Sequence, residues 1–105
     1  MEEVSLFHST HRRAAGSSRA ALIGVVASGN LEVLVERVLP DLECQVQVRT
    51  PIEGFTSLWG AVVADFVERH SPGGLRFSIN DGGARPDVVS LRLSQAVRLI
   101  ERSEP

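Results

Sequence analysis

Residues 42–70 decide the fold class of this chain, and they read LECQVQVRTPIEGFTSLWGAVVADFVERH. Between residues 42 and 48 every second residue is apolar, which predicts a strand with one buried and one solvent-facing side. From Phe55 to Val67 the apolar residues recur three and four positions apart instead, which predicts an amphipathic helix. The chain therefore combines strands and helices.

The start of this helix is open to two interpretations. Residues 50–53 (Thr-Pro-Ile-Glu) fit a capping box with proline at the first helical position, whereas Gly54 weakens that turn and favours a start near Phe55. The end of the helix is better defined by residues 71–74 (Ser-Pro-Gly-Gly). Proline lacks the backbone N–H that a continuing helix needs, and the glycines readily adopt the left-handed conformation in which helices end.

Three further segments have the character of strands. Residues 21–27 form a continuous apolar run, as expected of a strand covered on both faces. Residues 31–36 and 75–79 alternate between apolar and polar side chains, and residues 80–83 (Asn-Asp-Gly-Gly) end the second of these strands with strong turn chemistry. The C-terminal segment is ambiguous over residues 88–93.

Residues 88–93 suit either a strand or the first turns of a helix that begins near Pro86 or Asp87, and a helix is favoured for residues 94–102. The resulting order β-β-β-α-β-α predicts an α+β fold in two layers, with an antiparallel or mixed sheet of about four strands and two helices on one face. Residues 1–19 lack periodicity and are expected to form a loosely ordered N-terminal arm with at most a short strand at residues 4–7.

Composition narrows the functional classes. The chain has 105 residues, 43% of them hydrophobic, and a net charge of −2, which leaves it without the basic surface that nucleic-acid binding needs. The longest uncharged apolar stretch, residues 20–31, is shorter than the roughly 18 residues of a membrane-spanning helix. Cys44 is the single cysteine, so no internal disulfide can form, which fits a reducing, cytoplasmic compartment.

A converging set of catalytic side chains cannot be assembled from the sequence. His8, His11 and His70 are best read as surface or helix-end residues, and no cysteine and histidine spacing indicates a metal site. Asp81 and Asp87 are a candidate pair of carboxylates for acid/base chemistry. Asp81 precedes glycine, however, and this dipeptide is first of all a turn signal. We therefore expect a protein that is not itself an enzyme.

The segment around Ser28 is unusual, because small residues lie between two hydrophobic strands. One interpretation is a plain hairpin or bulge in which Gly29 supplies a positive φ angle. The other is an attachment point, since a serine hydroxyl displayed beside glycine is accessible to a modifying enzyme.

This segment also carries a resemblance to a known family. Residues 26–36, VASGNLEVLVE, resemble the Ser-Gly-(Asn/Asp)-Leu-Glu-Val-Leu signature of the malonate decarboxylase acyl carrier proteins, also called delta subunits. Residues 46–50, 80–86 and 88–96 support the resemblance, which covers about residues 20–100. The chain is similar, more distantly, to the acyl carrier (gamma) subunit of citrate lyase.

The resemblance implies that residues 20–105 form a single acyl-carrier domain and that Ser28 is the covalent attachment site, with Gly29 and Asn30 beside it. The implied prosthetic group is 2′-(5″-triphosphoribosyl)-3′-dephospho-CoA, joined to serine through a phosphodiester, whose thiol carries acetyl and malonyl groups. The implied partners are an acyl-carrier transferase subunit, decarboxylase subunits, a prosthetic-group transferase and a malonyl/acetyl loading enzyme. Ala27 stands where relatives have glycine, and Asn30 where some have aspartate.

Two alternatives to a malonate decarboxylase carrier stay open at this point. The chain could be the citrate lyase carrier subunit, or a non-catalytic structural or interaction module without an attached group. In the carrier interpretation, Arg76, Arg85 or Arg92 is expected to meet phosphates of the arm, because guanidinium groups match phosphate oxygens. The turn at residues 81–83 is expected on accessible surface, as is the turn that holds Ser28.

Overall fold

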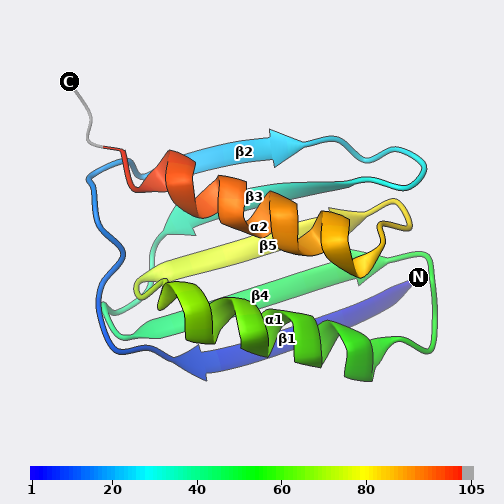
Figure 1. Ribbon diagram of the computed structural model, residues 1–105, viewed down its shortest axis with the longest axis horizontal. Coiled ribbons are helices and arrows are strands. Elements are labelled where there is room, and N and C mark those ends of the chain that lie inside the picture. Colours follow the sequence, from blue (N-terminus) through cyan, green and yellow to red (C-terminus); the bar gives the residue numbers. More distant parts are fainter. Residues whose placement is uncertain (103–105) are drawn as a thin grey trace.

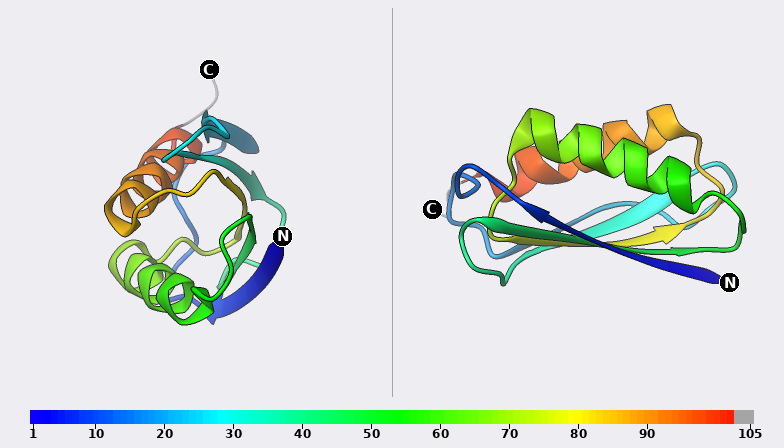
Figure 2. Two further views of the ribbon diagram at one scale, coloured as in Figure 1. Left: turned by 90° about the vertical axis from the view of Figure 1, so that its right-hand side faces the viewer. Right: turned by 90° about the horizontal axis from the view of Figure 1, so that it is seen from below.

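The computed structural model describes residues 1–102 as a five-stranded sheet covered on one face by two helices (Figures 1 and 2). The elements, in chain order, are β1 (Glu2–Ser9), β2 (Ala20–Gly24), β3 (Leu31–Arg37), β4 (Glu43–Thr50), α1 (Thr56–His70), β5 (Leu75–Asp81) and α2 (Pro86–Ile100). The end of the predicted acyl-carrier domain, residues 103–105, lies outside the described residues.

The strand order across the sheet is β1-β4-β5-β3-β2. β4 and β5 are parallel neighbours, and the other three pairs are antiparallel. Parallel neighbours need a crossover connection, and α1 supplies it between β4 and β5. The predicted α+β class, with a mixed sheet and two helices, is confirmed, although the sheet has five strands where about four were expected.

The core lies between the sheet and the two helices. Alternate residues of the three central strands point into it, so that Val33, Val46 and Phe77 are fully buried. Phe66 of α1 packs edge-on against Phe77, with ring centroids 5.3 Å apart. Cys44 is also buried on this face, as its place in the alternation predicts.

The prediction of a loosely ordered arm at residues 1–19 is wrong. Residues 2–9 form β1, which pairs with β4 over its whole length, from Glu2 opposite Thr50 to Ser9 opposite Glu43. The strand is hard to recognise because it lies at the sheet edge and carries mostly polar side chains, with Val4 as its one buried residue. Its stability comes from pairing with a segment about 40 residues away, which local periodicity does not reveal.

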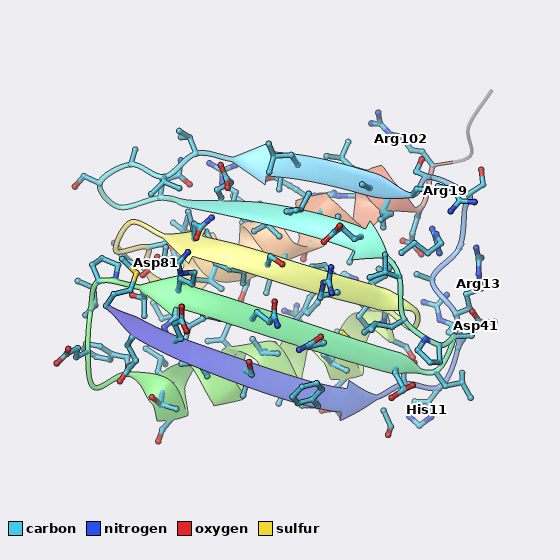
Figure 3. The ribbon with its side chains drawn as sticks, turned by 180° about the vertical axis from the view of Figure 1, so that it is seen from behind. His11, Arg13, Arg19, Asp41, Asp81 and Arg102 are labelled. Atoms are coloured by element: carbon cyan, nitrogen blue, oxygen red, sulfur yellow. The ribbon has the colours of Figure 1, made fainter. Side chains whose placement is uncertain are left out.

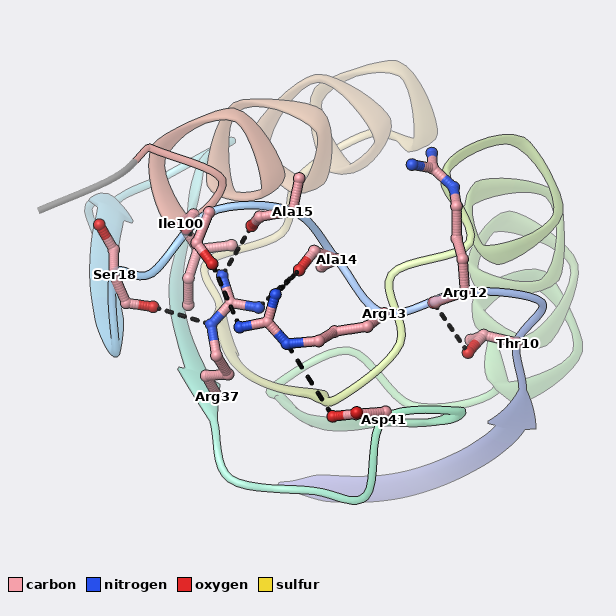
Figure 4. A network of polar contacts seen from close by, with 10 residues as sticks. Thr10, Arg12, Arg13, Ala14, Ala15, Ser18, Arg37, Asp41 and Ile100 are labelled. Atoms are coloured by element: carbon pink, nitrogen blue, oxygen red, sulfur yellow. Dashed lines mark hydrogen bonds and ion pairs between the residues drawn. The ribbon is translucent and has the colours of Figure 1, made fainter.

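Arg37 fixes the connection between β1 and β2 (Figure 4). Its guanidinium donates hydrogen bonds to the carbonyl oxygens of Ala14, Ala15 and Ser18, at 2.7, 2.8 and 3.0 Å. It also donates to the carbonyl oxygen of Ile100, at 3.0 Å, and so satisfies one of the open carbonyls at the end of α2. The connection is thereby tied to both the sheet and a helix.

The strand predicted at residues 21–27 is shorter and more exposed than expected. β2 ends at Gly24 and forms the sheet edge, where Leu22 is 59% exposed, so the prediction that it is covered on both faces is wrong. The helices cover one face of the sheet only, and the apolar character of residues 25 and 26 belongs to an exposed loop.

Both open helix boundaries are settled by the structure. α1 begins at Thr56, which excludes the capping box, and Thr50 instead ends β4 with its side chain fully buried. α2 begins at Pro86, a residue suited to the first turn because it lacks the N–H that would have no partner there. Residues 88–93 are therefore helical.

Candidate functional site

Ser28 lies on the loop of residues 25–30, which joins β2 to β3 at one end of the sheet (Figure 1). Ser28 and its neighbours from residue 25 to residue 29 are all exposed. Within residues 1–102, no group hydrogen-bonds the Ser28 hydroxyl. The hydroxyl is therefore accessible and chemically available, as an attachment point requires.

Gly29 gives this loop its backbone shape. Its φ angle is +75°, in the left-handed region that side chains other than glycine's rarely adopt. No atom lies within 4 Å of where a β-carbon would stand at Gly29, so the requirement for glycine is conformational and not a matter of space. The loop beside Ser28 is open to solvent on this side.

Asn30 closes the turn and links it to α2. Its backbone N–H donates to the carbonyl oxygen of Ala27, at 2.9 Å. Its side-chain Oδ1 accepts hydrogen bonds from the backbone N–H of Leu31, at 2.8 Å, and from Nε of Arg92, at 3.2 Å. Asn30 thus fixes the serine turn on the sheet and on the helix at once.

The β5–α2 connection packs directly against the serine loop. The backbone N–H of Gly29 donates to the carbonyl oxygen of Gly82, at 3.1 Å, and the N–H of Gly82 donates back to the carbonyl oxygen of Asn30, at 2.8 Å. A β-carbon at Gly82 would fall 2.1 Å from the carbonyl oxygen of Ala27, so only glycine permits this approach. Two connections more than fifty residues apart in sequence therefore form one hydrogen-bonded unit.

Asp81 is the buried anchor of this unit, with 6% of its surface exposed. One of its carboxylate oxygens accepts from the Thr50 hydroxyl and the other from the backbone N–H of Ala84, both at 2.8 Å. The turn at residues 81–83 was expected on accessible surface, but Asp81 is buried and the two glycines are half-buried. Its role is to hold the turn from below, because carboxylates accept turn N–H groups well.

The three candidate arginines differ in position. Arg92 lies beside the serine loop, bonded to Asn30 and to Oε1 of Gln95. Arg85 is exposed at the start of α2, where its nearest ion-pair partner is Asp87, at 3.5 Å. Arg76 pairs with Glu36 near the start of β5, at the other end of that strand from Asp81, so it does not belong to this site.

An apolar groove lies on the other side of the β5–α2 connection, and we call it the α1–α2 groove. It has a volume of about 330 Å³ and is lined chiefly by the apolar side chains Ile52, Phe55, Leu58, Trp59, Val62 and Val89. The sequence reasoning missed it. The available signal was the apolar stripe of α1, which extends to Phe55 and Leu58 although both are exposed.

The other titratable side chains do not form a second site. Asp81 lies at the opposite end of the sheet from His11, Arg13 and Asp41 (Figure 3). No three histidine, cysteine or acidic side chains among residues 1–102 are placed to hold a metal ion. Burial lowers the pKa of His70, whose ring packs against Phe66.

The exposed loop fits a large covalent substituent. Ser28 lies among the exposed residues 25–29, in the connection between the paired strands β2 and β3, and the neighbouring Gly29 adds no side chain. None of the helices described for residues 1–102 has the length and apolar character needed to cross a membrane.

Comparison with known proteins agrees with this arrangement. Residues 18–100 match the family model of the malonate decarboxylase delta subunit. The chain is 65% identical over 100 residues to the malonate decarboxylase acyl carrier protein of Bradyrhizobium diazoefficiens, covering 95% of each chain. It is 51% identical over 86 residues to the protein of that name from Stenotrophomonas maltophilia, covering 82% of this chain and 81% of the other.

A solved structure shares the fold as well as the sequence. A chain from the crystal structure of a Pseudomonas malonate decarboxylase hetero-tetramer in complex with malonate superposes with a TM-score of 0.83 at 36% identity. The match covers 95% of this chain and 99% of that one, so nearly the whole fold is shared.

Proposed function

Because the chain belongs to the malonate decarboxylase delta subunit family, we propose that it is the acyl carrier subunit of a malonate decarboxylase and that Ser28 bears its prosthetic group. The observation that carries the assignment of Ser28 is its exposed, unpaired hydroxyl on a loop whose backbone is held on both sides. Gly29 and Asn30 shape the loop, and neither supplies chemistry.

The group expected at Ser28 is derived from 2′-(5″-triphosphoribosyl)-3′-dephospho-CoA. In the attachment step, the Ser28 oxygen attacks the phosphorus nearest the ribose, and the bond from that phosphorus to the next phosphate breaks. Pyrophosphate leaves, and the hydroxyl proton passes to a base of the prosthetic-group transferase. The product is a phosphodiester between Ser28 and the arm.

The residues of this chain position the group and do not react further. When bound, the group supplies a thiol that carries acetyl and malonyl as thioesters, in which a carbonyl stabilises the negative charge left by loss of CO₂. The bonds between Gly29 and Gly82 hold the attachment point, while Arg92 places a positive charge next to it. The non-catalytic role is part of this proposal, and no three histidine, cysteine or acidic side chains among residues 1–102 are placed to hold a metal ion.

A tethered thioester needs partner sites that it can reach in turn. We propose that an acyl-carrier transferase exchanges acetyl for malonyl, that decarboxylase subunits remove CO₂, and that a malonyl/acetyl loading enzyme charges the arm at the outset. The tether raises the effective concentration of the acyl group at each site.

The cytoplasmic location stays a prediction that rests on the single buried Cys44.

The matching family and all three relatives described above belong to malonate decarboxylase, which favours this complex over citrate lyase. A structural module without an attached group is the remaining alternative. It predicts that unmodified protein supports malonate turnover as well as modified protein does.

Intact-mass measurement tests the proposal. Protein produced together with the prosthetic-group transferase should gain the mass of the donor less pyrophosphate, and Ser28→Ala should gain nothing. Ser5→Ala, which removes an exposed hydroxyl from β1, is the matched control and should be modified in full. Modification of the Ser28→Ala protein would remove Ser28 from its role.

A further inference from the structure

The α1–α2 groove has no occupant within residues 1–102, and it adjoins the β5–α2 connection that holds the serine loop. Phe55 and Leu58 are 47% and 42% exposed at its edge, whereas Trp59 forms its floor and is 7% exposed. Exposed apolar side chains gathered around a hollow indicate a binding surface more often than isolated ones do.

The groove and the serine loop lie on either side of the same short connection. Gly29 is hydrogen-bonded to Gly82, and the next residue, Gly83, lines the groove. Consecutive α-carbons are about 3.8 Å apart, so an arm anchored at Ser28 has only a short connection to cross. Gly82 and Gly83 carry no side chains of their own, and a β-carbon at Gly83 would meet nothing within 4 Å.

The charge of the groove lining bears on which of the two acyl groups it would accept. Asp81 is the one charged side chain among the described lining residues, and none of those residues is lysine, arginine or histidine. Both oxygens of Asp81 accept hydrogen bonds, one from the Thr50 hydroxyl and one from the backbone N–H of Ala84. A second carboxylate brought beside it, such as that of a malonyl group, would be repelled, whereas an acetyl group carries no charge.

We propose that the α1–α2 groove shelters the thioester end of the arm on Ser28 and takes the acetyl form in preference to the malonyl form. This inference rests on the proposed function. The carrier then protects the acetyl thioester between transfers, while the malonyl group stays extended and available to the decarboxylase subunits.

The fluorescence of Trp59 can report on the groove, because Trp59 is the single tryptophan of the chain and lines the groove. Carrier loaded by the transferase is first checked by intact mass for the adduct on Ser28. Trp59 emission and its quenching by acrylamide are then compared in unmodified, free-thiol, acetyl and malonyl protein. The acetyl form should show a changed emission and reduced quenching, and the malonyl form should resemble the free thiol.

The reactivity of the thioester gives a second readout on the isolated carrier. If the groove buries one methyl-sized group, hydroxylamine should cleave the acetyl thioester on the carrier about fourfold more slowly than it cleaves free acetyl-CoA. Leu58→Glu places a charge at the groove edge and should abolish this protection. Leu91→Glu is the matched control, since Leu91 is a leucine of α2 with 48% exposure that does not line the groove.

The outcomes separate the two proposals. An adduct on Ser28 with equal quenching and equal cleavage in all forms would refute the shelter and leave the carrier function intact. Failure to find any adduct on Ser28 would overturn both. If Leu58→Glu leaves cleavage unchanged but weakens binding of the decarboxylase subunits, the groove binds a partner protein and the shelter is refuted. Equal protection of acetyl and malonyl would refute the selectivity.

Discussion

The backbone N–H of Gly29 and the carbonyl oxygen of Gly82 are hydrogen-bonded at 3.1 Å, and through this bond the serine loop is held by the end of β5. The N–H of Gly82 returns a bond to the carbonyl oxygen of Asn30, so the two connections are joined by a pair of hydrogen bonds. The Ser28 side chain makes no hydrogen bond within residues 1–102, and the loop that carries it is held by the backbone bonds of Gly29 and Asn30. In the proposed carrier, this loop would hold the attachment point of the arm.

Gly82→Ala should impair attachment at Ser28. The added β-carbon would lie 2.1 Å from the carbonyl oxygen of Ala27, so the serine loop has to shift and its two bonds to residue 82 weaken. We expect slower modification by the prosthetic-group transferase, measured as the fraction of adduct against time by intact mass.

Gly60→Ala is the control for this change, because a β-carbon there meets nothing within 4 Å and Gly60 lies inside α1. Alanine in a helix interior should stabilise the protein by about 0.5–1 kcal/mol and leave modification unaffected. Modification of Gly82→Ala at the rate of the unchanged protein would show that the coupling of the two loops has no influence on the attachment site.

The turn around Ser28 could be predicted from the sequence because the residues that shape it lie close together in the chain. Small residues, a glycine with positive φ and an asparagine that bonds the following N–H all act within three positions of Ser28. The buried side of each central strand is likewise visible as simple alternation.

The remaining features depend on distant partners. Thr50 precedes Pro51 and reads as a helix cap, but its hydroxyl bonds Asp81, which lies 31 residues away on the neighbouring strand. β1 depends on its pairing with β4, and the α1–α2 groove forms only where both helices begin beside the β5–α2 connection. Periodicity within one segment carries no information on such contacts.

Thr50→Val should destabilise the protein. Valine keeps the shape of this fully buried side chain but removes the hydroxyl that donates to Asp81, leaving a buried carboxylate oxygen without that partner. The expected loss is about 1–3 kcal/mol in the free energy of unfolding, measured by urea denaturation. Thr56→Val, which removes an exposed and longer hydrogen bond to Glu2, should have little effect. Equal losses from the two variants would contradict a special role for the Asp81 anchor.

Arg37→Lys should loosen the β1–β2 connection even though it keeps the charge. A single ammonium group cannot replace a planar guanidinium that donates to four carbonyl oxygens, those of Ala14, Ala15, Ser18 and Ile100. Hydrogen exchange of the amides in residues 14–18 should accelerate, while the amides of the central strand β5 stay protected. Exchange unchanged in both regions would show that the connection is held by its backbone contacts alone.

Cys44 should not react with thiol reagents in the folded protein. Burial raises the pKa of its thiol to about 12, so at pH 8 only about one molecule in ten thousand carries the reactive thiolate. Because burial raises the pKa of this thiol in the folded protein, the folded state favours the neutral thiol over the thiolate. This contribution to the free energy of unfolding is present below pH ~8.5 and declines as the pH rises toward 12. Iodoacetamide at pH 8 should therefore add no mass to unmodified native protein and one group to the same protein in urea. Carrier with a free-thiol arm should gain one group in the native state, on the arm and not on Cys44. Labelling of Cys44 in native unmodified protein would mean that its strand opens more readily than its burial indicates.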